Sequence, residues 1–197
     1  MGLMFLPKSD KKLHNELYLK SKFPKTYKYV SKFKEILLAR GSFVYKYQGK
    51  PFYLFYGAES MKSRYKVVWS RMGSKIEAAV VDSITDKFFS AKPPIPQETL
   101  IFVPANSLDE AHYLCALINS DFALSIVKKY STVGGKSFAS THILKYVKIP
   151  KYNPKDAIHT KLSELSKLAH KYAKEGKDKE LEQTEAEIEN NVKNLLG

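Results

Sequence analysis

The hydrophobic positions along the chain change from a helical pattern to a strand pattern and then back. Apolar residues recur at helical spacing from Phe23-Pro24 to Arg40-Gly41, which predicts a helix because proline suits a first helical turn. Aromatic and β-branched residues then predict strands, which continue at Phe88-Phe89 and Thr99–Val103. The earlier runs with a strand pattern are 43–47, 51–56, 66–71 and 76–82.

Helical spacing returns at Ser107, which begins a capping box with Glu110 three residues later. We expect a helix from there to about Asn119-Ser120 and a second one from Asp121 to about Lys129. Two amphipathic patterns, 156–173 and 178–196, flank a short glycine turn. The whole pattern predicts an α+β fold with a mostly antiparallel curved sheet, a helical hairpin and a C-terminal antiparallel helix pair.

Positive charge is concentrated in the first three quarters of the chain. The formal net charge is +13, whereas residues 152–197 hold 8 Lys and 9 Asp or Glu. We therefore divide the chain into a lead-in segment (1–22), a basic domain (23–151) and a helical hairpin (152–197). A basic domain attracts polyanions, because each phosphate that it neutralises releases counterions. The alternative is that the charge only keeps the protein soluble.

A basic, hydroxyl-rich loop follows the two helices predicted between Ser107 and Lys129. Its paired glycines, Gly134-Gly135, allow the backbone to approach a phosphate closely, and neighbouring hydroxyl and amine groups can donate hydrogen bonds to it. A plain surface turn is the alternative. The nucleic-acid contacts predicted here are Lys128, Lys129, Tyr130, Thr132, Lys136 and Ser137.

A second predicted contact is the small, basic turn that joins the strand runs 66–71 and 76–82. A two-stranded ribbon fits the major groove of B-form DNA, so a basic turn at its end is a plausible probe of that groove. Arg71 has an alternative role, which is to pair with a carboxylate such as Asp82. The contacts assigned to this region are Lys66, Arg71, Ser74 and Lys75.

Several of these segments also carry a family resemblance. The runs Glu110–Ser120, Gly134–Ser140 and Val147–Pro150 resemble, in that order, the C-terminal specificity domain of TaqI-like adenine-N6 DNA methyltransferases and fused restriction-modification enzymes. The family also carries a strand of the form Lys-apolar-apolar-x-x-Arg, matched here by residues 66–71. Its C-terminal helix resembles residues 188–197, where Leu196 replaces an aromatic residue.

The resemblance implies a sequence-specific, target-recognition domain that binds duplex DNA. The chain would position a target adenine for methylation or cleavage by a catalytic domain in the same polypeptide or in a separate subunit. That catalytic domain would use S-adenosylmethionine and possibly Mg²⁺, and no cofactor or metal is expected in this chain.

Other functions remain open. An RNA-binding module could stack bases on exposed tyrosines at the alternating positions Tyr45, Tyr47, Tyr53 and Tyr56. A restriction endonuclease subunit with a degenerate active site is a further alternative. A third is an assembly protein whose terminal helices recruit a partner.

Catalytic and membrane signatures are missing from the sequence. The single cysteine, Cys115, excludes an intramolecular disulfide, and the five histidines show no metal-ligand spacing. Pro93-Pro94 lacks the polar and aromatic flanks of the amino-methyltransferase motif. No apolar run approaches the roughly 20 residues of a membrane span. We expect a non-catalytic, cytoplasmic chain with no membrane partner.

Overall fold

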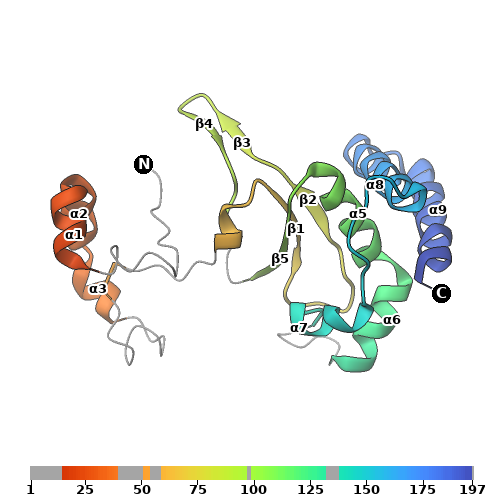
Figure 1. The fold of residues 1–197 in the computed structure, drawn as a ribbon, viewed down its shortest axis with the longest axis horizontal. Helices are drawn as coiled ribbons and strands as arrows, with labels where there is room; N and C mark the ends of the chain where they lie inside the picture. Colours follow the sequence, from red (N-terminus) through yellow and green to blue (C-terminus); the bar gives the residue numbers. More distant parts are fainter. Residues whose placement is uncertain (1–14, 40–50, 54–58, 97–98, 132–137, 197) are drawn as a thin grey trace. The chain divides into compact units, whose positions relative to one another are not determined.

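The computed structural model describes residues 15–39, 51–53, 59–96, 99–131 and 138–196. The chain divides into two compact units, residues 1–61 and 62–197. Neither boundary predicted from composition, after residue 22 or after residue 151, coincides with this division. The predicted α+β class is confirmed, because the second unit combines a small antiparallel sheet with helices that include a C-terminal pair (Figure 1).

The N-terminal unit is helical in its described part. Its helices are α1 (Glu16–Lys22), α2 (Pro24–Ser31) and α3 (Lys34–Leu38), so the helix predicted from residue 23 to residue 40 is interrupted at residues 32–33. Asn15 begins α1, because its Oδ1 accepts a hydrogen bond from the Leu17 N–H at 2.9 Å. Buried Leu19, Phe52 and Tyr53 form the core of this unit.

The second unit is built on a three-stranded antiparallel sheet in the order β2-β1-β5. The strands are β1 (Tyr65–Ser70), β2 (Ala79–Val81) and β5 (Leu100–Ala105), and a short 3-10 helix, η2 (Glu59–Lys62), precedes them. A hairpin of β3 (Ile84–Asp86) and β4 (Phe89–Lys92) forms a separate two-stranded sheet that extends away from the first (Figure 1). The predicted runs 43–47 and 54–56 lie outside the described residues.

Helices follow the sheet along the chain. They are α5 (Leu108–Asn119), α6 (Asp121–Tyr130), α7 (Thr141–Leu144), the 3-10 helix η3 (Lys145–Val147), α8 (Ala157–Glu175) and α9 (Asp178–Leu196). Among them, α7 and η3 were not predicted from the sequence. The Ser107 Oγ accepts a hydrogen bond from the Glu110 N–H at 3.0 Å, as a capping box requires. Glu110 reaches back one residue further than expected, to the backbone N–H of Asn106 at 2.7 Å.

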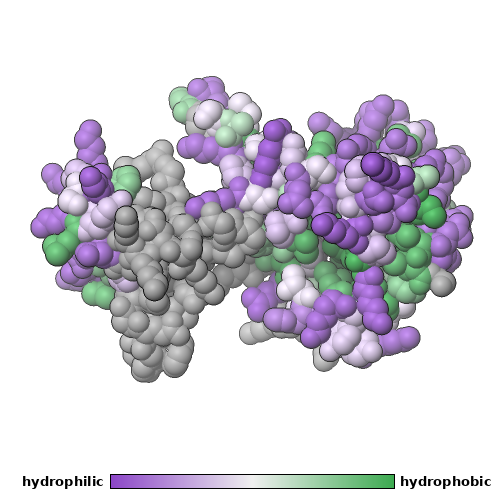
Figure 2. Space-filling view, in the orientation of Figure 1, coloured by the Kyte–Doolittle hydropathy of each residue, from purple (hydrophilic) through white to green (hydrophobic). Residues whose placement is uncertain are grey.

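Helix α5 is the central element of the second unit. One side of it packs on the sheet, where Cys115 and Ile118 join a core cluster with Val67 and Trp69. Its other side packs on α8, where Leu117 belongs to a second cluster that also includes Ile188 and Val192 of α9. In the view of Figure 2 the outer surface over α8 is mostly hydrophilic, as expected for a helix that buries one face.

Candidate nucleic-acid interface

Two exposed tyrosines, one at the end of α6 and one in η3, stack on each other. The rings of Tyr130 and Tyr146 have centroids 4.3 Å apart and planes inclined by 13°. Their side chains are 56% and 46% exposed, so the stack is largely in contact with solvent. The Nζ of Lys145 lies 5.1 Å from the centroid of the Tyr146 ring, within the range of a cation–π contact. The result is an aromatic surface with a cation beside it.

More lysines lie next to this tyrosine pair along the chain. Lys128 and Lys129 occupy the last turn of α6, and Lys148 follows η3; all three are exposed. We name this group the cationic end, and it consists of Lys128, Lys129, Lys145 and Lys148 together with Tyr130 and Tyr146. Buried neighbours fix the backbone segments that carry these lysines. The lysines therefore stay close together without a specific contact between them.

Those buried neighbours explain why the charged side chains face solvent. Val127 in α6 is fully buried, and Leu144 and Val147 anchor η3 in the same core cluster. Ser120 begins α6 because its Oγ accepts a hydrogen bond from the Ala123 N–H at 3.1 Å. With these positions turned inward, the lysines and tyrosines between them are directed outward.

The turn between β1 and β2 lies at the same end of the second unit. The Trp69 Nε1 donates a hydrogen bond at 3.0 Å to the carbonyl of Ala139, which ties β1 to the segment just before α7. Figure 1 shows the ends of β1 and β2 beside α7. The last turn of α6 and the β1–β2 turn therefore belong to one end of the second unit.

The predicted contact residues that the structure describes in these two segments are exposed, with one exception. Arg71, Ser74 and Lys75 lie on the surface of the β1–β2 turn, and the Arg71 N–H donates a hydrogen bond to the Thr99 carbonyl at 2.9 Å. Lys128, Lys129 and Tyr130 belong to the cationic end. Thr132, Lys136 and Ser137 lie outside the described residues.

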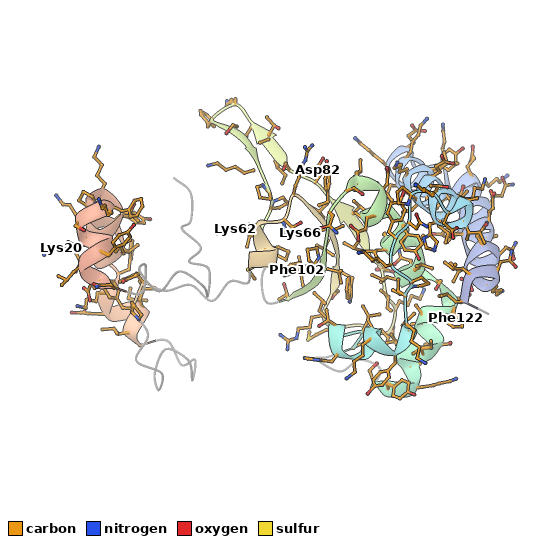
Figure 3. All side chains as sticks on the ribbon, viewed as in Figure 1. Lys20, Lys62, Lys66, Asp82, Phe102 and Phe122 are labelled. Atoms are coloured by element: carbon orange, nitrogen blue, oxygen red, sulfur yellow. The ribbon has the colours of Figure 1, made fainter. Side chains whose placement is uncertain are left out.

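The exception is Lys66, which is fully buried on β1 (Figure 3). Its Nζ donates a hydrogen bond to the carbonyl of Ser63, and burial lowers the pKa of its amine. Lys66 therefore does not present its amine to solvent in this structure, and a nucleic-acid contact at Lys66 stays a prediction. The strand β1 is central in its sheet and its neighbouring Val67 is also buried, so both of its faces are covered at this point.

Two alternatives drawn from the sequence also have a structural outcome. Asp82, the suggested partner of Arg71, binds Arg64 with 2.8 Å between Arg64 Nε and Asp82 Oδ1. Tyr53, one of the tyrosines suggested for base stacking, is buried. The other three, at positions 45, 47 and 56, lie outside the described residues.

Tyr146, Lys145 and Lys148 are absent from the residues assigned as contacts from the sequence. Their local signal is a single aromatic residue between lysines, which follows the glycine loop and the segment 138–144. That signal becomes informative only when α6 brings Tyr130 against Tyr146, which lies sixteen positions along the chain.

Cys115 and His159 both lie in buried surroundings. Burial raises the pKa of the Cys115 thiol to about 12, so the reactive thiolate is disfavoured. His159 accepts a hydrogen bond from the Asn153 N–H at 3.0 Å, and its Nε2 lies 3.3 Å from the Tyr113 hydroxyl. In the part of the chain that the structure describes, no group of three or more His, Cys, Asp or Glu side chains is placed to hold a metal ion.

Among the described residues, no helix combines the length and the apolar character that crossing a membrane requires.

Comparison of the chain with protein-family models and with curated proteins found no match. The resemblance to specificity domains of adenine-N6 methyltransferases therefore stays a prediction from its motifs.

Proposed function

We propose that the chain is a duplex-DNA-binding, target-recognition module of a restriction-modification enzyme. The observation that carries this proposal is the cationic end, where a pair of stacked tyrosines lies close in the sequence to four exposed lysines. The β1–β2 turn adds Arg71 and Lys75 at the same end of the unit. Phosphate contacts of this kind supply affinity and orientation, whereas base contacts supply specificity.

The role in restriction and modification is supported by the motif resemblance alone. In this proposal a catalytic domain in the same polypeptide or in another subunit binds S-adenosylmethionine, and possibly Mg²⁺, and acts on the DNA that this chain positions. The chain itself supplies phosphate and base contacts.

The test is binding of the full chain to labelled duplex DNA, duplex RNA and single-stranded DNA across a salt series, measured by fluorescence anisotropy. The variants Lys128→Ala/Lys129→Ala and Lys145→Ala/Lys148→Ala should each weaken duplex binding at least about tenfold at low salt. Each pair should also reduce the salt slope by about 2, because each phosphate contact contributes about 1.

The matched control removes two exposed lysines of α8, Lys171→Ala/Lys174→Ala. This control should bind like the wild type. Equal weakening by the control would mean that net charge alone governs binding. Absence of binding to any of the nucleic acids at low salt would contradict the proposal.

Single-stranded nucleic acid is a second candidate ligand, and the tyrosine stack favours it. Aromatic side chains that stack on bases contribute about 1–3 kcal/mol per base in single-strand binding proteins. If a single strand is the ligand, Tyr130→Leu should weaken its binding at least about fivefold while duplex binding changes little. Tyr29→Leu, in the N-terminal unit, is the control, because Tyr29 is also an exposed tyrosine with an aromatic neighbour.

A further inference from the structure

A groove of about 680 Å³ lies between α8, α9, the junction of α5 and α6, and residues 76–79. Small or aliphatic side chains line much of it: Ala78, Ala116, Ala169, Ala186 and Ile188. Small residues on facing helices leave room between the backbones that larger side chains would fill. The groove thus offers an apolar surface within reach of a partner's side chains.

Carboxylates surround this apolar surface. Glu77, Asp121, Glu185 and Glu189 line the groove, and no lysine or arginine does so among the described residues. This local excess of negative charge contrasts with the net charge of +13 of the whole chain. Phosphate-bearing ligands are repelled from such a surface, so it is separate in its chemistry from the cationic end.

Glu189 gives a second, independent indication of a cationic ligand. Its Oε2 accepts a hydrogen bond from the Asp121 N–H at 2.9 Å, at the start of α6. Its Oε1 is buried and accepts no hydrogen bond from the residues that the structure describes. A buried carboxylate oxygen without a donor is costly, and because the Glu189 side chain as a whole is half-buried, a cation placed beside it would be stabilising. Glu185 lies one helical turn earlier on α9 and is exposed.

We propose that this groove binds a segment of a protein partner in which lysine or arginine side chains alternate with apolar ones. Apolar side chains of the segment would pack on the alanines of α8 and α9. Basic side chains of the segment would lie beside the carboxylates of Glu77, Asp121, Glu185 and Glu189. Charge-assisted hydrogen bonds of this type are about twice as strong as neutral ones.

The experiment selects ligands for the full chain from a phage-displayed library of random peptides, each long enough for roughly four helical turns. Phages that bind the Ala186→Trp variant are removed, because the indole would fill the groove at an exposed helical position without changing the charge. The expected outcome is a set of peptides enriched in Lys or Arg and in apolar residues. A selected set with no enrichment in basic residues, or no peptide that distinguishes wild type from Ala186→Trp, would overturn the proposal.

Affinities of one selected peptide then locate its contacts. Glu185→Lys and Glu189→Gln should each weaken binding at least about tenfold. Glu182→Lys is the matched control, because Glu182 is an exposed glutamate of α9 that does not line the groove. This control should stay within about twofold of wild type. Equal weakening by Glu182→Lys would show general charge attraction and contradict a groove site. Thermal unfolding of each variant confirms that the fold is kept.

Discussion

Asn119 holds both backbone polar groups of Ala78. Its Oδ1 accepts a hydrogen bond from the Ala78 N–H at 2.7 Å, and its Nδ2 donates one to the Ala78 carbonyl at 2.9 Å. The Sγ of Cys115 reaches the same carbonyl at 3.3 Å. The end of α5 therefore supplies the hydrogen-bond partners that an adjacent strand would supply in a sheet. These bonds fix the α5–α6 hairpin to the segment before β2.

Replacing Asn119 with alanine should lower the free energy of unfolding by about 1–3 kcal/mol, because Ala78 is buried and its N–H would lose its partner. Urea unfolding followed by circular dichroism measures this change. Asn190→Ala is the matched control, an exposed asparagine in the interior of α9, and it should leave stability unchanged or slightly higher. Equal stability of both variants would show that solvent replaces the Asn119 bonds without cost.

Stability should depend on pH through His112, which is buried in α5 beside α8. Burial, followed by the nearby His170 and Lys167, lowers the pKa of His112 to about 4, and Asp109 acts in the opposite direction. Its Nδ1 lies 3.1 Å from the Ser166 Oγ, and its ring meets that of His170 edge to face. The folded protein therefore holds His112 in its neutral form.

The sign of the effect follows from the lowered pKa. Below pH 6.5 the unfolded chain gains a proton at His112 that the folded chain does not, so stability falls between pH 6.5 and about 4. The loss from this group should be about 3 kcal/mol. Urea unfolding at several pH values checks it. The slope of the unfolding free energy against pH should be smaller in His112→Gln than in the wild type. It should be unchanged in His142→Gln, which alters an exposed histidine. An unchanged slope in His112→Gln would contradict this assignment.

Lys148 ends η3 in a left-handed backbone conformation, with φ of 54°. Non-glycine residues adopt this conformation at a cost, so Lys148→Gly should raise the free energy of unfolding by about 0.5–1 kcal/mol. Lys148→Ala removes the same charge but keeps the backbone cost, and it should give no such gain. If the proposed function is correct, both variants should bind duplex DNA more weakly than wild type. A gain in stability from alanine equal to that from glycine would contradict the backbone explanation.

The elements with strong local signals were predictable from the sequence. The periodic apolar residues of α9 predicted its observed range, 178–196, and Gly176 adopts the left-handed conformation that commonly ends a helix such as α8. The strand predicted from residue 76 is different, because β2 begins only at Ala79. The reason is the Asn119 contact with Ala78, which joins residues 41 positions apart and leaves no trace in the local pattern.

The candidate site was less predictable, for a related reason. A lysine in an alternating strand is expected to face solvent, but Lys66 belongs to a central strand that is covered on both faces at that point. The contact between Tyr130 and Tyr146 likewise depends on how α6 and η3 pack together. The residue types predicted a basic contact region. Which of its residues are exposed could be told only from the tertiary structure.

The burial of Lys66 gives a last prediction, on nucleic-acid binding. Lys66→Met should leave duplex affinity within about twofold of wild type, because a fully buried amine bonded to the Ser63 carbonyl cannot neutralise a phosphate. Lys75→Met, on the exposed β1–β2 turn, should weaken binding about threefold or more and reduce the salt slope by about 1. Anisotropy titrations at several salt concentrations measure both effects. If Lys66→Met stays folded and weakens binding as much as Lys75→Met, then Lys66 becomes accessible when the protein binds DNA.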